Sequence, residues 1–516
     1  MYPTMVASQA LISMLASWDK GQLPNIPESF FKNRVLTTLF GIFVATLKAQ
    51  NLDGSWGIGP SRETTAYALI ILATSASLPL ASYLSSQLCV ANEAGRDFLL
   101  QHRESWSEPD YIWRAKTTYG SGVFAETYVI TALAIPMPSH KLSPSVDRLC
   151  ELEDDDREIL LPRVRNLSIF SDTPFWLVEA ALIEGNLYKL IVRQAGLDIF
   201  PRRDILSTTH IDAISFTWSA SNHIKGAGMS PTMLFHMMVA CLLMYELDYY
   251  METSIAQLGF TKINGVRALI DSIFDERDSD IGSSKNGNSE ISHTLHCFTN
   301  WFLQNTSVPK SSKFDQNLLK KELRVYLLTQ VTSVEESLRL AGPDSDSTPA
   351  KIFSTTETFY DWIHGTSAPH VGGLLVFSFI TCLLGAQQQN SQDCFPNVEA
   401  NYLAQDLSAH LAALARIEND YGSVARDLKE CNTNSVNFPE FSSTSADSSS
   451  ALDVSAAKTK LEHVAAFERE CYQMVMRRLE TLVDLKISRS LQTYCNDVDL
   501  FGQLYAVDDP SPKMEQ

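Results

Sequence analysis

The sequence lacks the cysteine pattern of a disulfide framework or a zinc site. Its 516 residues include nine cysteines, which are scattered without a C-x-x-C pair. Unpaired, scattered cysteines are typical of a reducing compartment.

The chain also has fewer basic than acidic residues. The chain has 41 Lys and Arg against 60 Asp and Glu, so its formal net charge is −19. This balance argues against nucleic acid or an anionic membrane as the main partner. An anionic substrate would need locally placed arginines and metal ions to be held.

We also expect neither a secretory leader nor a membrane-spanning segment. The N-terminus has no basic segment before the short apolar run ALISMLA. No apolar stretch looks long enough to span a bilayer. We therefore expect a soluble, cytoplasmic protein, with 45% hydrophobic residues and a length that allows two or three domains.

The most informative stretch is 416–441, RIENDYGSVARDLKECNTNSVNFPEF. At about 100° per residue, Asn419, Ser423 and Asp427 fall on one helical stripe roughly 80° wide. Arg416 and Arg426 project onto the same stripe. Three oxygen ligands suit Mg²⁺, which completes its shell with water and phosphate oxygens, and guanidinium groups suit the phosphates.

A solvated helix face is the alternative for any isolated match of this kind. Here the preceding LSAHLAALARI has apolar residues at helical spacing, which indicates that the polar stripe interrupts a buried face. Buried polar groups need partners, and a metal–diphosphate cluster would supply them.

The stretch resembles the second metal-binding motif, N-D-x-x-S-x-x-x-D/E, of class I terpene synthases. Its wording is closest to the C-terminal region of fungal bifunctional copalyl diphosphate/ent-kaurene synthases. The resemblance implies an all-α fold, in which a class I helical bundle over 156–516 follows a truncated α-barrel remnant over 1–155. It also implies about three Mg²⁺ ions as cofactor.

The turn QNLDGSWG at 50–57 resembles the QW motif of the family's α-barrel domain, where the role is structural. The Asp-x-Asp-Asp motif of the family's protonation-initiated site should lie upstream of it. The acids before Gln50 are Asp19 and Glu28. We therefore expect that protonation-initiated cyclisation is not available to this chain.

The helical stretch 231–255 is apolar until acids appear near its end. Asp248 and Glu252 are spaced i and i+4, so both can face one cation; a polar helix end is the alternative. The family has D-E-x-x-E here, and Tyr249 replaces the second acid. Asp248 is therefore the stronger candidate ligand and Glu252 the weaker.

A second acidic run, Asp154-Asp155-Asp156, superficially matches a D-D-x-x-D/E motif. Prolines surround it and no long amphipathic helix carries it, so we interpret it as a solvated linker. The stretch 355–384 is a helix interrupted near Gly372-Gly373, which is either a broken helix lining the pocket floor, as in the family, or a plain helix–helix turn.

The predicted function is a Mg²⁺-dependent class I diterpene synthase, a diphosphate-releasing lyase of fungal secondary metabolism. Asp248, Glu252, Asn419, Ser423 and Asp427 would bind metal. The remaining predicted site residues are the phosphate-clamping Arg416 and Arg426, Tyr505 as a cap over the diphosphate, and an aromatic wall of Trp218, Phe216, Trp362 and Phe377.

Geranylgeranyl diphosphate is the favoured substrate, and a copalyl-type diphosphate is the alternative. Two other classes of function stay open. A catalytically inactive relative acting as a binding partner is suggested by Tyr249, and a prenyltransferase is ranked lower because a second aspartate-rich motif of that family is missing. The sequence indicates neither the product skeleton nor the oligomeric state.

Overall fold

The computed structural model describes residues 1–114, 117–152, 157–165, 167–200, 208–224, 229–275, 289–340, 358–388, 393–430, 432–441 and 453–507. The chain forms two compact units. The N-terminal unit comprises Met1–Arg165 and Asp172–Ile191, and the C-terminal unit comprises Asn166–Ser171 and Val192–Gln516. The predicted boundary at 155/156 and the acidic run Asp154–Asp156 lie outside the described residues.

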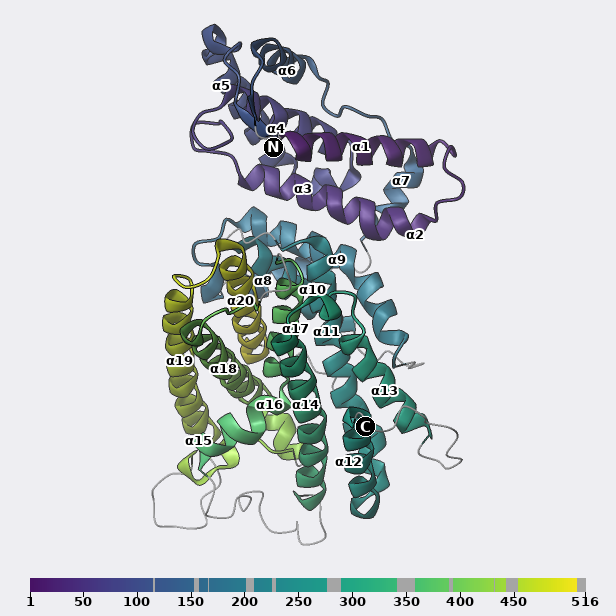
Figure 1. Ribbon diagram of the computed structural model, residues 1–516, viewed down its shortest axis with the longest axis vertical. Helices are drawn as coiled ribbons and strands as arrows, with labels where there is room; N and C mark the ends of the chain where they lie inside the picture. The colour runs from purple at the N-terminus through teal and green to yellow at the C-terminus, as the bar shows by residue number, and fades with distance from the viewer. Residues whose placement is uncertain are drawn as a thin grey trace. The chain divides into compact units, whose positions relative to one another are not determined.

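The N-terminal unit is built from short helices (Figure 1). They are α1 (Tyr2–Asp19), α2 (Glu28–Phe30), η1 (Phe31–Leu36), α3 (Thr37–Lys48), α4 (Arg62–Ser75), η2 (Pro79–Leu84), α5 (Ser85–Gln101), η3 (Arg103–Ser105), α6 (Gly122–Ala134), α7 (Pro144–Leu149) and α8 (Arg157–Val164). The first part of α9 (Phe175–Leu197) also belongs to this unit.

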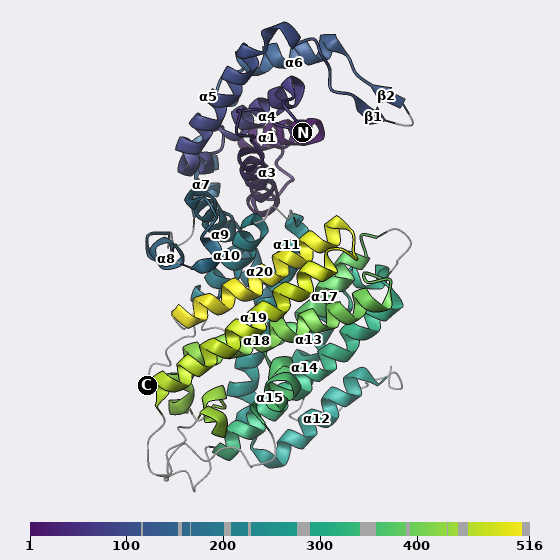
Figure 2. The same cartoon turned by 90° about the vertical axis from the view of Figure 1, so that its left-hand side faces the viewer.

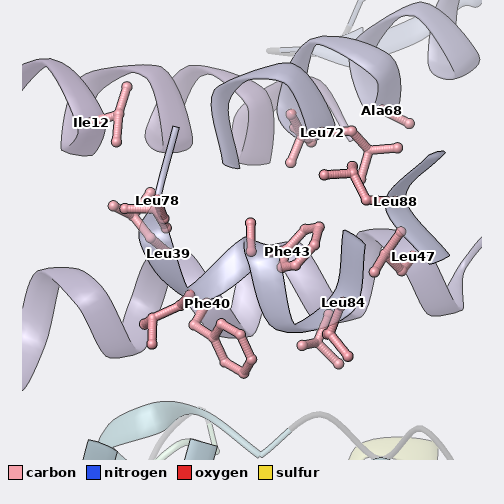
Figure 3. Close-up of a cluster of buried hydrophobic side chains, with 14 of the residues drawn as sticks. Ile12, Leu39, Phe40, Phe43, Leu47, Ala68, Leu72, Leu78, Leu84 and Leu88 are labelled. Carbon is pink, nitrogen blue, oxygen red and sulfur yellow. The ribbon is translucent and has the colours of Figure 1, made fainter. Parts of the chain in front are cut away.

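Aliphatic and aromatic side chains of these helices form one core (Figure 3). Ile12 of α1, Phe43 of α3 and Leu72 of α4 are all fully buried in it. The stretch Glu28–Lys48 is long and apolar enough to cross a membrane by length and composition, with a mean hydropathy of 1.3. The expectation that no stretch reaches that length was therefore wrong, although 56% of this segment is buried inside the protein.

The turn at 50–57 is a built structural element. Trp56 is fully buried, and its indole Nε1 donates to the carbonyl oxygen of Thr46 at 2.7 Å. Gln50 Nε2 donates to the carbonyl of Ala91 at 2.9 Å. A Cβ on Gly95 would lie 2.7 Å from the Trp56 ring. The indole thus fills the space between the turn and α5, as predicted.

The fold is almost entirely helical, but the described residues also include one antiparallel hairpin. Strands β1 (Ile112–Arg114) and β2 (Thr117–Tyr119) pair with Trp113 opposite Thr118. The sequence analysis had placed this stretch within a helical domain. Three consecutive β-branched or aromatic residues, Thr117 to Tyr119, favour the strand.

The C-terminal unit is a bundle of longer helices (Figure 1). It contains η4 (Ser168–Phe170), the end of α9, α10 (Thr208–Ile224), α11 (Pro231–Tyr250), η5 (Met251–Ile255), η6 (Ala256–Leu258), α12 (Phe260–Phe274), α13 (Ser289–Leu303), η7 (Val308–Lys310), α14 (Lys313–Leu340), α15 (Phe359–Trp362), η8 (Ile363–Ser367), α16 (Ala368–His370), α17 (Gly373–Gly385), α18 (Val398–Glu430), η10 (Ser435–Asn437), η11 (Pro439–Phe441), α19 (Val454–Leu479) and α20 (Leu485–Val507).

Helices α18, α19 and α20 lie side by side (Figures 1 and 2). Two glycines allow the close approach of α18 and α20. A Cβ on Gly422 would lie 2.3 Å from the carbonyl oxygen of Tyr505, and one on Gly502 would overlap the carboxylate of Glu418. Arg469 of α19 ties the three helices together through ion pairs with Glu418 and Asp499.

Within the predicted interrupted helix, the described residues from 358 onward form a broken helix. Segments α15 to α16 and helix α17 meet at Gly372, with a bend of 54°. Gly372 has a φ of +73°, a left-handed conformation that glycine adopts without steric cost. A Cβ there would also lie 2.4 Å from the Met244 methyl carbon, so the break is built for close packing against α11.

Candidate active site

The C-terminal unit encloses a cavity of about 220 Å³. Each helix contributes residues at helical spacing from one face. The lining residues are His210, Ile214, Thr217 and Trp218 of α10, Cys241, Met244, Tyr245 and Asp248 of α11, Tyr326 and Gln330 of α14, His370, Val371, Gly373 and Val376 around the helix break, Ala415, Arg416 and Asn419 of α18, and Tyr494, Asp497, Val498, Phe501, Gly502 and Tyr505 of α20. The broken helix therefore lines the cavity.

Asp248 lies in the cavity wall with one oxygen left open. Its Oδ1 is buried and has no hydrogen-bond partner among the described residues; His370 Nε2 lies 3.5 Å away. Burial raises the pKa of the carboxyl to about 6, while Arg416 and Arg426 favour the ionised form. An oxygen in this state is prepared to accept a cation or a donor from a ligand.

Arg416 lies in the same cavity and is held on several sides. Its Nε lies 2.8 Å from Asp420 Oδ1, and its Nη2 donates to the carbonyl oxygen of Thr433 at 2.6 Å. The guanidinium carbon lies 5.2 Å from the Trp362 ring centre. Only 8% of Arg416 is exposed, so a fixed positive charge faces the cavity at a defined place.

His370 connects Arg416 to Asp248. Burial, followed by the charge of Arg416, lowers the pKa of His370 to about 3, so the imidazole is neutral. Arg416 Nη1 lies 3.4 Å from His370 Nδ1. Because arginine can only donate, Nδ1 accepts and the ring proton is on Nε2, which faces Asp248. The imidazole therefore bridges α11 and α18 at the charged end of the cavity.

The stripe of α18 is partly engaged within the protein. Asn419 lines the cavity. Ser423 Oγ donates to Asp427 Oδ2 at 2.5 Å, and Asn434 Nδ2 donates to the same oxygen at 2.8 Å. Ser423 and Asp427 are buried and do not line the cavity. They form a fixed hydroxyl–carboxylate pair one and two turns beyond Asn419.

Asp420, the second residue of the motif, supports Arg416 from behind. It is fully buried, and Ser435 donates to its Oδ2 from both the backbone nitrogen, at 2.7 Å, and the hydroxyl. Burial raises its pKa to about 6, against the opposing charge of Arg416. The segment that follows the motif thus clamps the side chains of the motif.

Arg426 and Glu252 differ in their relation to the site. Arg426 does not line the cavity, but its charge acts on both Asp248 and His210, whose pKa values it lowers. Glu252 lies in the π-helical turn η5, is exposed and is not among the cavity-lining residues. Of the two acids predicted on α11, the structure brings Asp248 alone to the cavity.

The predicted aromatic wall is divided between cavity and core. Trp218 and Tyr505 line the cavity. Phe216 is buried beside Phe170, with ring centres 6.3 Å apart, and Phe377 is stacked on Phe395. Trp362 lies under Arg416 and packs against Phe438. Phe216, Phe377 and Trp362 therefore support the wall or its charge from behind.

Sequence reasoning missed several lining residues. They are His210, Tyr245, Gln330, His370 and Asp497. Asn434, which donates to Asp427 behind the motif, was also missed but does not line the cavity. His210 is stacked on Tyr245 with ring centres 3.5 Å apart, and burial lowers its pKa to about 3. The signal that was available is periodicity: Tyr494, Asp497, Phe501 and Tyr505 follow one face of α20.

Several known proteins are similar in sequence to this chain. The chain is 30% identical to a pimaradiene synthase of Emericella nidulans, over 98% of this chain and 54% of the relative. It is 27% identical to an ent-kaur-16-ene synthase of Fusarium fujikuroi, over 100% of this chain and 56% of the relative. It is also 27% identical to a phyllocladan-16-alpha-ol synthase of Phomopsis amygdali, over 99% and 55%. No family model matches the chain.

The chain is homologous over its whole length to fungal diterpene synthases. It spans about half the length of the curated relatives it matches. A shorter match, 31% identical over 26% of this chain, is to a copalyl diphosphate synthase of Talaromyces verruculosus.

The predicted metal ligands are few and come from different parts of the chain. Among the residues that the structure describes, no three or more His, Cys, Asp or Glu side chains form a group able to hold a metal ion. The predicted set draws on an amide and a hydroxyl as well, and its carboxylates, Asp248 and Asp427, come from different helices. Such a set relies on ligand oxygens to complete a cation's shell.

Proposed function

We propose that the chain is a Mg²⁺-dependent class I diterpene synthase. It ionises a C20 allylic diphosphate, with geranylgeranyl diphosphate favoured, and cyclises the resulting carbocation. The observation that carries the proposal is the meeting of Asp248 on α11 with Arg416 and Asn419 on α18 at one cavity. These residues are far apart in the sequence, and the cavity's remaining lining is largely aromatic and aliphatic.

The residues at the charged end fit a magnesium–diphosphate cluster. Asp248 offers a buried oxygen without a hydrogen bond, and Asn419 offers an amide oxygen on the facing helix. Asp248, Asn419, Ser423 and Asp427 would hold Mg²⁺, and Glu252 remains a weaker candidate. Bound Mg²⁺ would supply Lewis-acid stabilisation of the departing diphosphate.

The chain's own residues then position the substrate. Arg416 is anchored by Asp420 and Thr433, so its charge needs no reorganisation when the diphosphate leaves. Arg426 would add a second positive charge, because its field already reaches Asp248. Tyr505 would cap the diphosphate from α20.

The apolar part of the cavity would hold the hydrocarbon chain. The face of the Trp218 ring favours a nearby cation, and a buried wall excludes water until the reaction ends. Phe216, Trp362 and Phe377 would act by fixing this wall and Arg416 in place. Such a reaction would occur in the cytoplasm on a small-molecule substrate, without nucleic acid.

The test is incubation with geranylgeranyl diphosphate, with and without Mg²⁺, followed by measurement of released diphosphate and of the extracted hydrocarbons by mass spectrometry. We expect Mg²⁺-dependent diphosphate release and one or more cyclic C20 products. Absence of release with a folded protein would overturn the proposal for this substrate.

A copalyl-type diphosphate is the second substrate to test, since relatives of this chain are named ent-kaur-16-ene synthases. If that substrate alone is consumed, the enzyme is a kaurene synthase-like cyclase. If neither substrate releases diphosphate, the chain is an inactive relative, which is the outcome that Tyr249 in the first motif would favour.

A further inference from the structure

Asp497 is a buried acid in the cavity wall to which the proposed metal and phosphate chemistry gives no role. It lies on α20, on the same face as Tyr494 and Tyr505, and only 5% of it is exposed. Thr217 of α10 hydrogen-bonds its carboxyl group. Its Oδ1 atom is buried and has no hydrogen-bond partner in the part of the chain that the structure describes. A carboxyl oxygen left in this state costs free energy and calls for an explanation.

Two polar side chains in the same wall, Trp218 and Tyr494, are already engaged with other groups. Trp218 Nε1 donates to Cys241 Sγ at 3.4 Å, and the Tyr494 hydroxyl donates to the carbonyl oxygen of Gly373 at 2.9 Å. The open Oδ1 is therefore an acceptor in the same wall as these two paired groups. The buried Nδ1 of His210, also in this wall, likewise has no hydrogen-bond partner among the described residues.

Asp497 is electrostatically separate from the charged end of the cavity. Arg416 and Arg426 act on the pKa of Asp248, whereas burial, opposed by the Thr217 hydrogen bond, governs the pKa of Asp497 and raises it to about 8. Among the residues that the structure describes, no arginine contributes to the pKa of this carboxyl. Its basicity is therefore available to the apolar part of the cavity.

We propose that Asp497 is the base that ends the cyclisation. Its carboxylate oxygen Oδ1 takes a proton from the carbon next to the final cationic centre. The carbon–hydrogen bond breaks, its electron pair forms the carbon–carbon double bond of the product, and the proton forms an O–H bond with Oδ1. The step needs no further reactant, and it rests on the function proposed above.

The surroundings of Asp497 suit this role. A carbocation opposite the carboxyl favours its ionised form, and a carboxylate in a buried site holds an accepted proton more firmly than one in water. Cys241 of α11 and Tyr494 of α20 interact electrostatically with it, and His210 of α10 lines the same cavity. Burial raises the pKa of the first two and lowers that of His210, so all three are neutral near pH 7.

The test compares Asp497→Asn with the parent. The amide keeps the shape of the side chain but is not a base. We expect diphosphate release to stay within about threefold of the parent, while the share of the main cyclic alkene falls by about a hundredfold, the lower end of general-base effects. Earlier-terminated alkenes or alcohols formed with water should take its place.

Asp499→Asn is the matched control on the same helix. Asp499 is equally buried, but it pairs with Arg469 and Tyr472 instead of facing the cavity. We expect lower stability with an unchanged product pattern. Circular dichroism of both variants reports whether they are folded.

A second arm uses the unaltered protein between pH 7 and about pH 9. The carboxyl becomes mostly ionised as the pH rises through its pKa of about 8. The main alkene's share of total product should therefore rise in the parent and stay flat in Asp497→Asn.

Two outcomes would overturn the inference: a folded Asp497→Asn protein with the parental product pattern, or a parental product share that does not change with pH. Failure of the proposed function is a different result, because the parent itself would then release no diphosphate.

Discussion

Replacing Arg416 by lysine keeps the positive charge but removes contacts that hold the side chain in place. The Arg416 guanidinium makes an ion pair with Asp420 at 2.8 Å, a hydrogen bond to the Thr433 carbonyl at 2.6 Å and a stack on Trp362 at 5.2 Å. A lysine ammonium has no planar fork, so it can keep one of these contacts. If it keeps the ion pair with Asp420, the Thr433 bond and the stack are lost.

The magnitude follows from those two losses. A hydrogen bond from a charged donor contributes about 1.5–3 kcal/mol, and a partly desolvated cation–π contact contributes about 0.5–2 kcal/mol. We therefore expect Arg416→Lys to lower the free energy of unfolding by about 2–5 kcal/mol. Diphosphate release should fall by about two orders of magnitude, the scale of one preorganised electrostatic group.

The assay is urea unfolding followed by circular dichroism, with diphosphate release measured in parallel. Arg324→Lys is the control, because Arg324 pairs with Asp271 at 2.6 Å on the surface, where both side chains are about half exposed. Its loss should be under about 1 kcal/mol. If Arg416→Lys were as mild as Arg324→Lys, the anchoring argument would be refuted.

Two further predictions concern the packing and ionisation of α18. Gly422→Ala should lower the free energy of unfolding by about 1–3 kcal/mol, because its Cβ would lie 2.3 Å from a backbone oxygen. Gly265→Ala is the control: its Cβ would meet no described atom within 4 Å, so it should stabilise α12 by about 0.5–1 kcal/mol. Both are read from urea unfolding, and equal effects would contradict the close approach of α18 and α20. The side chains of His410 and Glu468 are hydrogen-bonded at 2.6 Å, and this bond raises the pKa of His410. Burial alone would raise the pKa of Glu468, but hydrogen bonds from His364 and His410 lower it overall. The pair should contribute fully to the free energy of unfolding between about pH 4.5 and 6.5. This contribution should be lost as the pH falls through the pKa of Glu468 in the folded protein, or rises through that of His410. A stability–pH profile that His410→Gln leaves unchanged would disprove it.

Helical periodicity predicted the bundle and the central stripe. The apolar spacing around 231–255 and 398–430 is strong enough to indicate helices, and α11 and α18 carry Asp248 and Asn419 as expected. The turn at Trp56 was also predictable, because a large apolar side chain in a short helix–helix turn is expected to fill the gap between the helices.

The aromatic wall could not be predicted by residue type. Phe216 lies about 200° around the helix from Trp218, so it faces the core next to Phe170 while Trp218 faces the cavity. Which face of α10 points toward the cavity depends on how α10 packs on α20, and the local sequence does not determine that packing.

His370 and Asp497 escaped notice for a related reason. A single histidine or aspartate carries no motif, and each gains its meaning from partners far away in the chain: Arg416 and Asp248 for His370, and Thr217 for Asp497. The hairpin at 112–119 was missed because its strands are three residues each, too short to show a period.

The central claim is that Asp248 and the α18 stripe act on one diphosphate. It is tested most directly by the rate of diphosphate release from geranylgeranyl diphosphate with Mg²⁺ in Asp248→Asn, in Asn419→Ala combined with Ser423→Ala, and in all three changes together. We expect each variant to lose about two orders of magnitude or more, and the combined variant to be little worse than the weaker of the two, because residues acting as a unit are not additive. Near-parental rates in both folded variants would contradict the account.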